Sequence, residues 1–465
     1  MTNIQRERKR SVLGRGLKMP LLVVALISAA CAGGADGGDT TIPAENTTVP
    51  AGDTTTVPAV TTTEGSVEPQ TLTMWSYSGR EQADQNLVPA FEAASGNTIL
   101  REFIPQPYEQ TVLARWAAGE RPDILDWGAI GNWMIQLDPE ENLIAFNDEE
   151  FVSRYTVDDY ISNSGAVNGQ YYSAVTGYPY MDGVLFNRKV FAELGIAVPT
   201  NFVEVAAACE TIKQEMPDVA PIFSGGGDQW PLQILPFIVW NDAIQTTNLI
   251  EELNTNQVDW TDPRIVEGIE TQMELFDAGC FNEDILSATF DNEQTALMDG
   301  SAAMVFQGTW LIQSLLGVYD QAEVDENVGF APVSATTNVT SWQSGNAISL
   351  PKTGDPAREA AAMEYVRFAT GEGYQQYLED TFQFPIFEGY DPPAESAVAF
   401  IEANDAFLAN SVPQFQQTLL ASYGFFEAYL QEMVSGQKTP LEVAEALETE
   451  FERSAAAIGL EGFGG

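Results

Sequence analysis

From residue 71 onward the chain alternates short apolar strands with amphipathic helices, and this alternation restricts the possible folds more than any other feature. The segment QTLTMWSY alternates apolar and polar positions as a strand does. A helix pattern at about 80–95 and a second strand pattern, NTILREFI, follow it. In YEQTVLARWAAGE the apolar residues recur at helical spacing, and RPDILDWG is typical of a short buried strand behind a proline. Strands that alternate with helices predict an α/β fold with a largely parallel sheet.

The clearest local signals lie between residues 168 and 212. A strand pattern at about 170–175 precedes a turn rich in glycine and proline and a second strand pattern, VLFN. The next helix is expected to begin near Lys189 and to end at Gly195. Asn201 is a favourable N-cap for the helix after it, and Glu204 stands where it would complete a capping box. The apolar stripe of this second helix consists of Phe202, Val205, Cys209 and Ile212.

The chain of 465 residues is strongly acidic, with 20 Lys and Arg against 67 Asp and Glu and a formal net charge of −47. A nucleic-acid-binding protein needs the opposite sign, so that class of function is excluded. The acidic residues are spread along the chain, which is typical of a solvated surface in a salty medium; a cationic ligand is the alternative. There is no histidine, which removes the commonest metal ligand and the usual general base near neutral pH.

Residues 1–30 have the parts of a bacterial signal peptide. Six Lys and Arg precede the apolar run MPLLVVALISAA, whose 12 residues are too few to cross a bilayer as a helix. The next segment, SAAC, resembles a lipoprotein box, in which Cys31 would be lipid-modified and become the first residue of the mature chain. Ser28 departs from the usual Leu, Val or Ile of that box, and ordinary cleavage after Ala-x-Ala is the alternative. Residues 31–70, rich in Thr, Pro, Gly and acids, are expected to form a flexible tether.

Five segments of the body together resemble one family, the extracellular solute-binding proteins of sugar-importing ABC transporters, in the maltose-binding-like group. The resemblance covers about residues 70–455. Each segment alone is loose, but their shared order behind a lipoprotein-like signal is fairly specific. The segments are AAGERPDIL (117–125), NGQYYSAV with DGVLFNRKVFAELGIAVPTNFVEV (within 168–205), ALMDGSAAMVFQGTW (296–310), VGFAPV (328–333) and GNAISLPKTGDPAREAAAMEYVRFAT (345–370).

The resemblance implies an α/β fold of the two-lobed periplasmic-binding-protein type (type II), with discontinuous lobes joined by hinge strands. In the body (71–465), lobe one would hold about 71–178 and 331–384, and lobe two about 180–328 and 386–458. The crossings between the lobes would lie near 175–182, 329–333 and 384–387.

The same resemblance implies a receptor rather than an enzyme. It would act as a monomer without a cofactor, close on a sugar or oligosaccharide, and deliver it to the transmembrane subunits of an ABC permease. With a lipid on Cys31, the protein would be anchored to the outer face of the cytoplasmic membrane.

A sugar offers hydroxyls at its edges and C–H groups on its faces, so its site needs flat aromatic rings together with carboxylates or amides. Such pockets lie between domains, on loops that leave the ends of strands. Core packing is the alternative for each tryptophan, and an ordinary turn acid is the alternative for Asp182. Trp116 and Trp133 are expected in the core. The candidates expected to face the cleft are Trp75, Arg80, Asp126, Trp127, Tyr180, Asp182, Asp228, Trp230, Trp310 and Trp342.

The run FSGGGDQWP (223–231) first suggests a phosphate loop, but a glycine run alone is weak evidence. Asp228 stands where a phosphate site needs a donor or a positive charge, so phosphate is disfavoured. Pro231 suits the first turn of a helix. We therefore expect a flexible loop of lobe two that lets a ligand approach the backbone, Asp228 and the face of Trp230 together.

Several alternatives stay open at this point. Cys209 and Cys280 would share lobe two in an oxidising compartment, so they could form a disulfide, or Cys209 could be a buried thiol. No metal site is indicated; calcium stays open because acids are abundant, although EF-hand spacing is absent. The same fold could bind a cationic or zwitterionic solute such as a polyamine. A secreted carbohydrate-active enzyme would need a pair of carboxylates, and no spacing singles one out.

Overall fold

The computed structural model describes residues 68–464 except 78–79, 106, 157–163, 335–337 and 394–395. The signal segment, Cys31 and almost all of the expected tether lie outside the described residues. No helix within the described residues is both long enough and apolar enough to cross a bilayer.

The first sheet has the strand order β2-β1-β3-β12-β6. Strand β1 (Thr71–Tyr77) runs parallel to β2 (Thr98–Ile104) on one side and to β3 (Ile124–Asp126) on the other. Strand β12 (Ala347–Ser349) pairs antiparallel with both β3 and β6 (Ala174–Val175). The sheet is therefore assembled from segments far apart in the sequence.

The second sheet is built around β7 (Tyr180–Asn187), whose eight residues are all buried. Strand β9 (Ala302–Gly308) pairs antiparallel with β7 along one edge, and β8 (Ala220–Ile222) continues parallel to β9. Strands β10 (Val328–Ala331) and β11 (Thr340–Gln343) both pair antiparallel with β7. The parallel partner of β11 is β13 (Ser411–Pro413). Burial along whole strands shows that both faces of this sheet are covered.

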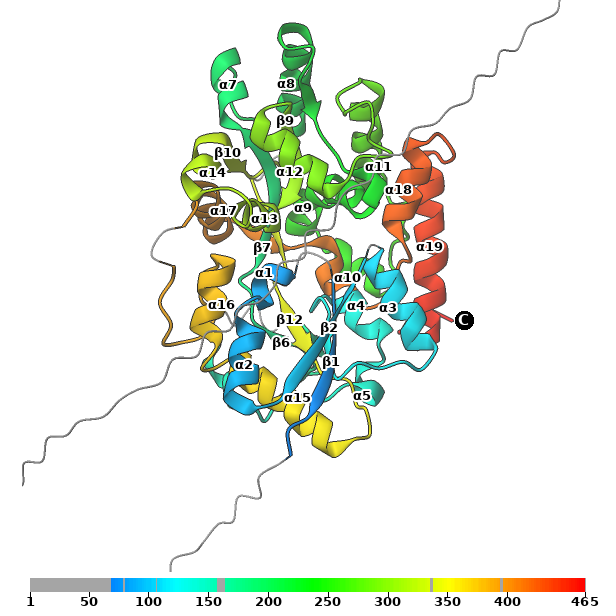
Figure 1. Cartoon of the computed structure of the whole chain (residues 1–465). Coiled ribbons are helices and arrows are strands. Elements are labelled where there is room, and N and C mark those ends of the chain that lie inside the picture. The colour runs from blue at the N-terminus through cyan, green and yellow to red at the C-terminus, as the bar shows by residue number, and fades with distance from the viewer. Residues whose placement is uncertain are drawn as a thin grey trace, which may run out of the picture. The chain divides into compact units, whose positions relative to one another are not determined.

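Helices and short elements connect these strands and lie around both sheets (Figure 1). Before β7 they are α1 (Glu81–Asp84), α2 (Leu87–Ser95), α3 (Tyr108–Ala117), α4 (Gly131–Gln136), α5 (Pro139–Asn142), η1 (Glu150–Arg154) and the hairpin of β4 (Ala166–Val167) and β5 (Gln170–Tyr171). Between β7 and β11 they are α7 (Arg188–Leu194), α8 (Phe202–Glu215), η2 (Gly226–Asp228), η3 (Trp230–Gln233), α9 (Ile234–Thr246), α10 (Leu249–Asn254), α11 (Pro263–Asp277), α12 (Phe290–Asp299), α13 (Trp310–Leu316) and α14 (Gln321–Asn327). After β12 they are α15 (Pro356–Ala369), α16 (Tyr374–Thr381), α17 (Val398–Ala409), η4 (Phe415–Thr418), α18 (Phe426–Val434) and α19 (Pro440–Ala457).

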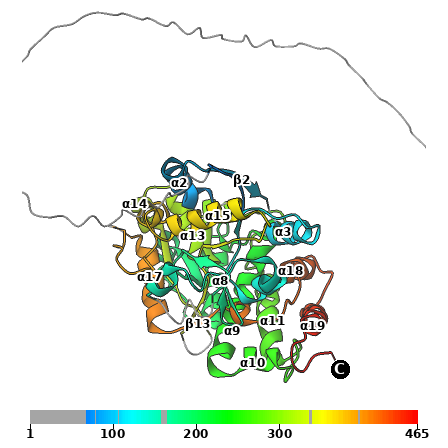
Figure 2. The ribbon, with the colours of Figure 1, turned by 90° about the horizontal axis from the view of Figure 1, so that it is seen from below.

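The two sheets occupy different halves of the described region. Figure 1 shows β1, β2 and β12 in the lower half and β9, β10 and the helices around them in the upper half. Seen from below, α15 and α2 lie side by side over the first sheet (Figure 2). The C-terminal helices α18 and α19 pack against α11, and their buried side chains belong to the same apolar cluster as several of those of β7 and β9.

Helix α8 shows how local sequence signals act. The Asn201 side chain caps it by accepting from the backbone N–H of Glu204, and α7 before it ends at Gly195 with φ +64°, so both predicted limits are confirmed. The capping box differs from the prediction, because the Glu204 carboxylate accepts from the N–H and hydroxyl of Thr200 instead of the Asn201 N–H. The predicted stripe faces inward, since Val205, Cys209 and Ile212 are fully buried.

A disulfide joins Cys209 of α8 to Cys280, with 5.7 Å between their Cα atoms. Both residues are buried in the apolar cluster beneath the second sheet. The bond therefore fixes α8 to the segment that follows α11.

Both sheets are mixed, so the prediction of a largely parallel sheet was wrong. The physical reason is that β12 and β7 belong to segments that pass between the sheets, and they enter their sheets against the direction of their neighbours. Strands β10 and β11 both belong to the second sheet, and the chain reaches the first sheet again only at β12. The expected limits of the two lobes stay a prediction.

Candidate functional site

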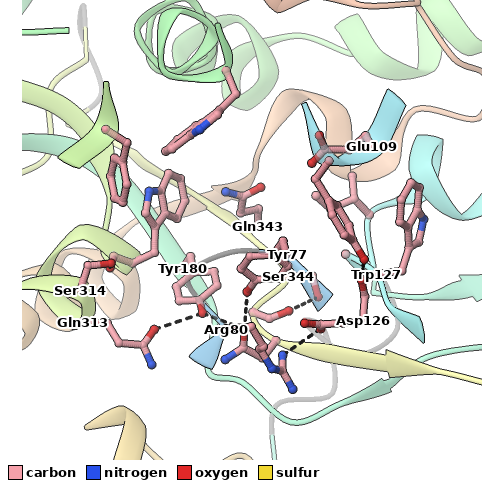
Figure 3. Close-up of a pocket in the computed structure, with 18 of the residues that line it drawn as sticks. Tyr77, Arg80, Glu109, Asp126, Trp127, Tyr180, Gln313, Ser314, Gln343 and Ser344 are labelled. Carbon is pink, nitrogen blue, oxygen red and sulfur yellow. Dashed lines mark hydrogen bonds and ion pairs between the residues drawn. The ribbon is translucent and has the colours of Figure 1, made fainter. Parts of the chain in front are cut away.

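A cavity of about 1350 Å³ opens between residues of the two sheets. This volume exceeds the roughly 300–1,000 Å³ of typical small-molecule pockets, so more than one ring of a ligand fits. Figure 3 shows Glu109, Asp126 and Trp127 on one side of the space and Tyr180, Gln313 and Ser314 on the other. Seven predicted residues line it: Arg80, Asp126, Trp127, Tyr180, Asp228, Trp230 and Trp310. Their role in ligand binding stays a prediction.

Three other predicted residues do not line the cavity. Trp75 lies within β1 and is buried in a cluster beside that strand, where the Arg115 guanidinium stacks 3.8 Å from its ring centroid. Trp342 is buried in the core between the sheets. Asp182 is buried within β7, where its Oδ2 accepts from Ser341 Oγ at 3.0 Å and from Gln414 Nε2 at 2.7 Å. Trp75 and Trp342 were expected on loops and Asp182 at the first crossing between the lobes, but all three are buried within strands.

A buried ion pair forms the floor of the cavity. Arg80 Nη1 lies 3.0 Å from Asp126 Oδ1 (Figure 3). Arg80 Nε also donates to Asp84 at 3.4 Å. Burial raises the pKa of Asp126 to about 7, and the Arg80 guanidinium opposes this shift. Among the described residues, Arg80 Nη2, Asp126 Oδ2 and Trp127 Nε1 have no hydrogen-bond partner. Burial leaves these three groups beneath the floor without a protein partner in the described chain.

One side of the cavity is a continuous series of aromatic rings beside the first sheet. Tyr77 meets Tyr108 at 5.8 Å between ring centroids, Tyr108 meets Trp127 at 6.0 Å, and Trp127 meets Trp133 at 5.5 Å. The prediction that Trp116 is core is confirmed by its 6% exposure. For Trp133 the same prediction was wrong, because α4 places its half-buried ring in the cavity lining.

The opposite side is a second aromatic series beside the second sheet. Tyr180 meets Trp310 edge-on at 5.6 Å, Trp310 meets Trp230 at 6.0 Å, and Trp230 meets Phe290 at 5.0 Å. Gly308 permits this arrangement, since a Cβ there would lie 2.0 Å from the Trp310 ring. We call Tyr180, Trp310, Trp230 and Phe290 the second aromatic wall, and the tyrosines and tryptophans opposite them the first.

The glycine run is packed rather than loose, so the expectation of a flexible loop was wrong. A Cβ at Gly225, Gly226 or Gly227 would lie 2.5 to 2.7 Å from backbone atoms of residues 285–290. The Gly227 N–H donates to the Ala288 carbonyl at 2.8 Å, and Asp228 Oδ2 accepts from the Phe290 N–H at 2.8 Å. The glycines thus let two loops meet backbone to backbone, and Trp230 leaves this joint toward the cavity.

Asn346 joins the two sides of the cavity and was not predicted. Its Oδ1 accepts from the hydroxyls of Tyr77 at 2.8 Å and Tyr180 at 3.2 Å, and its Nδ2 donates to the Tyr377 hydroxyl at 2.9 Å. The only sequence signal was its place behind a glycine in the segment QSGN.

Two further acids in the lining, Glu109 of α3 and Glu427 of α18, were also missed. Burial raises the pKa of each to about 7, and the charge of Glu427 adds to the shift of Glu109. Among the described residues, no group of three or more Asp, Glu, His or Cys side chains is placed to hold a metal ion. The arrangement offers aromatic faces, donors and acceptors, and no metal centre within the described chain.

A family model, described as bacterial extracellular solute-binding protein, matches residues 86–406, more than half of the chain. The chain belongs to this family. Its members bind solutes rather than transform them, so the prediction of a receptor is confirmed and the alternative of a carbohydrate-active enzyme is set aside.

Relatives and solved structures agree with this assignment. The melibiose/raffinose/stachyose-binding protein MelE of Bacillus subtilis (strain 168) is 22% identical over 427 residues, which are 83% of this chain and 90% of MelE. A chitin oligosaccharide binding protein superposes with a TM-score of 0.71 at 22% identity, covering 83% of this chain and 99% of that one. A sugar transporter protein of Bacillus licheniformis, solved with stachyose, gives a TM-score of 0.67 at 18% identity, covering 82% and 99%. These structures confirm the two-lobed type II fold.

Asp182 generates a prediction about pH. Burial raises its pKa from an ordinary value of 3.8 to about 7. A carboxyl with a raised folded-state pKa stabilises the fold most at low pH, and that contribution is lost as the pH rises from about 4 to about 7. Asp182→Asn should therefore gain about 2 to 4 kcal/mol in free energy of unfolding, relative to the unmodified protein, between pH 4 and pH 8.

Urea unfolding at a series of pH values measures this difference. Asp218→Asn, at an exposed position, is the matched control and should leave the pH profile unchanged. Parallel profiles for the Asp182 variant and the unmodified protein would contradict the assignment.

Proposed function

We propose that this protein is an extracytoplasmic receptor that binds an oligosaccharide between its two aromatic walls and delivers it to an ABC permease. The observation that carries this proposal is the cavity itself. It has a volume of about 1350 Å³, and the two aromatic walls lie on opposite sides of it. Binding and release are a hinge closure of two rigid lobes. The monomeric state expected from the sequence stays part of the proposal.

The chemistry of the lining suits a sugar better than a purely apolar ligand. Indole and phenol rings pack against the C–H faces of pyranose rings, while hydroxyls at the ring edges need partners that donate and accept. Gln313 and Asn346 lie beside Tyr180 in the lining, and their amides both donate and accept. The proposal also draws support from MelE and from the structure solved with stachyose, because both bear names of galactose-containing oligosaccharides.

Trp230 tests this proposal. Trp230→Ala removes one ring of the second wall, and we expect affinity for the bound oligosaccharide to fall about 10- to 100-fold, equivalent to about 1.4 to 2.8 kcal/mol. Native mass spectrometry of the freshly purified protein identifies a co-purified ligand. Titration calorimetry with stachyose, raffinose and a chitin oligosaccharide then measures binding.

The matched control is Trp75→Phe, which changes a tryptophan outside the cavity and should leave affinity unchanged. Unchanged affinity in the Trp230 variant would remove that residue from the site. Failure of every glycan to bind the unmodified protein would overturn the proposed function.

Charge restricts the class of sugar. Arg80 is the sole Lys or Arg among the described lining residues, and it is already paired with Asp84 and Asp126. An anionic sugar would therefore meet carboxylates without a free cation, at a cost of about 1 to 4 kcal/mol for each close pair. The acidic lining residues are Glu109, Asp126, Asp228, Asp291, Glu379, Asp380 and Glu427.

We expect uronate oligosaccharides to bind at least tenfold more weakly than neutral ones of the same length, with a gap that narrows at high salt. Calorimetry at two ionic strengths measures this difference in affinity, and equal affinities would contradict the charge argument.

The same acids favour one second candidate, a cationic solute such as a polyamine. Thermal stabilisation by spermidine and by no glycan would select that candidate.

We also propose that a lipid on Cys31 holds the protein at the outer face of the cytoplasmic membrane. The support is the sequence SAAC behind an apolar run and the acidic tether that follows. Metabolic labelling with a palmitate analogue should mark the membrane fraction of the unmodified protein and leave Cys31→Ser unlabelled. Label on the Cys31→Ser variant, or none on either protein, would contradict the anchor.

A further inference from the structure

A hydrogen-bonded chain of buried side chains runs beneath the second aromatic wall. The Trp310 indole Nε1–H donates to Gln307 Oε1 at 3.0 Å, and Gln307 Nε2 donates to Glu293 Oε2 at 2.7 Å. The backbone N–H of Gly225 donates to the other carboxyl oxygen, Glu293 Oε1, at 2.6 Å. Glu293 and Gln307 are 1% and 0% exposed, so water cannot replace either partner.

This series of hydrogen bonds connects the two tryptophans of the second aromatic wall. Trp310 begins α13 directly after β9, which carries Gln307. Gly225 begins the glycine loop from which Trp230 leaves, and Gln229 within that loop has φ +66°, a conformation rare for a residue with a side chain. A single carboxyl thus supports the loop behind one ring and the amide behind the other.

The directions of these bonds leave one choice for residue 293. An indole N–H and a backbone N–H can only donate, and each stands at one end of the chain. Because Trp310 donates to the oxygen of Gln307, the nitrogen of Gln307 must donate onward to residue 293. Residue 293 therefore receives donors on both of its side-chain atoms, which a carboxyl group can accept and an amide cannot.

The protonation state of the carboxyl does not change this conclusion. A proton taken up by Glu293 can occupy a lone pair that neither N–H group uses, because each carboxyl oxygen has two lone pairs. An amide has no such freedom, since both of its donors are fixed on nitrogen.

We propose that Glu293 is a positioning residue of the ligand-binding wall, which fixes the orientation of Trp230 and Trp310 by accepting from Gly225 and Gln307. Glu293 is absent from the cavity lining, so it acts through the residues above it. This inference rests on the proposed function for its effect on ligand affinity, but its effect on the two rings is independent of any ligand.

The test uses three variants of the full chain. In Glu293→Gln, the new side-chain NH2 group faces either the Gly225 N–H or the Gln307 NH2 group, so two donors meet. The double variant, Gln307→Glu with Glu293→Gln, moves the carboxylate group, which only accepts, from position 293 to its hydrogen-bond partner at position 307. Its carboxylate at position 307 would accept from Trp310 and from the amide at position 293, and the oxygen of that amide would accept from Gly225. Glu270→Gln, on an exposed position of α11, is the matched control for loss of a carboxylate.

Two readouts separate this inference from the proposed function. Fluorine NMR of protein labelled with 5-fluorotryptophan, assigned with Trp230→Phe and Trp310→Phe, reports the two rings without ligand. We expect Glu293→Gln to shift or broaden both resonances, the double variant to restore them, and the control to leave them unchanged. Stachyose, as the calorimetric probe, should bind about tenfold more weakly to Glu293→Gln and regain most of its affinity in the double variant.

Unchanged resonances in Glu293→Gln would overturn the inference, and so would a double variant that behaves like Glu293→Gln or fails to fold. If Glu293→Gln alone fails to fold, recovery by the double variant supports the inference. If stachyose and the other glycans do not bind the unmodified protein, the proposed function fails, while the resonances still decide the role of Glu293.

Discussion

The close contact between residues 176–178 and 344–346 sets the distance between the two sheets. The N–H groups of Thr176 and Gly177 both donate to the Asn346 carbonyl, at 2.8 and 3.0 Å. A Cβ on Gly177 would lie 2.4 Å from Asn346 N, and one on Gly345 would lie 2.3 Å from the Tyr178 carbonyl. Only glycine fits at these two positions. Because the same segments carry the chain from β6 to β7 and from β11 to β12, this contact fixes where the sheets end relative to each other.

The side chain of Asn346 extends that contact into the cavity. Its oxygen accepts from the hydroxyls of Tyr77, at the end of β1, and of Tyr180, at the start of β7. One amide thus orients the first members of both aromatic walls, and Glu293 supports the far part of the second wall from beneath. Buried polar groups behind the rings therefore help to hold the two sides of the cavity in place.

The sequence predicted the parts of this site that follow directly from strand–loop order. Asp126 ends β3 and Trp127 follows it, and Trp310 begins α13 soon after β9, so these strand ends were expected at the cavity and lie there. The predictions for Trp75 and Trp342 were wrong because each residue lies within a strand. Side-chain alternation along a strand shows which residues share a face, but it does not show which face meets the cavity. Trp133 was wrong because a helical pattern does not show which side of α4 meets a partner. The bond between Glu293 and Gln307 depends on tertiary packing, and no spacing in one sequence indicates it.

Burial gives three acidic residues of the cavity lining a protonation different from that of exposed acids. Burial raises the pKa of Asp126, Glu109 and Glu427 to about 7, so near neutral pH each of these groups exchanges between a carboxylate and a neutral acid. A carboxylate accepts from a hydroxyl, whereas a neutral acid can also donate to one. Sugar hydroxyls both donate and accept, so a lining of half-protonated acids can match them in either direction. Desolvation thereby adapts an acidic surface to a neutral, hydroxyl-rich ligand.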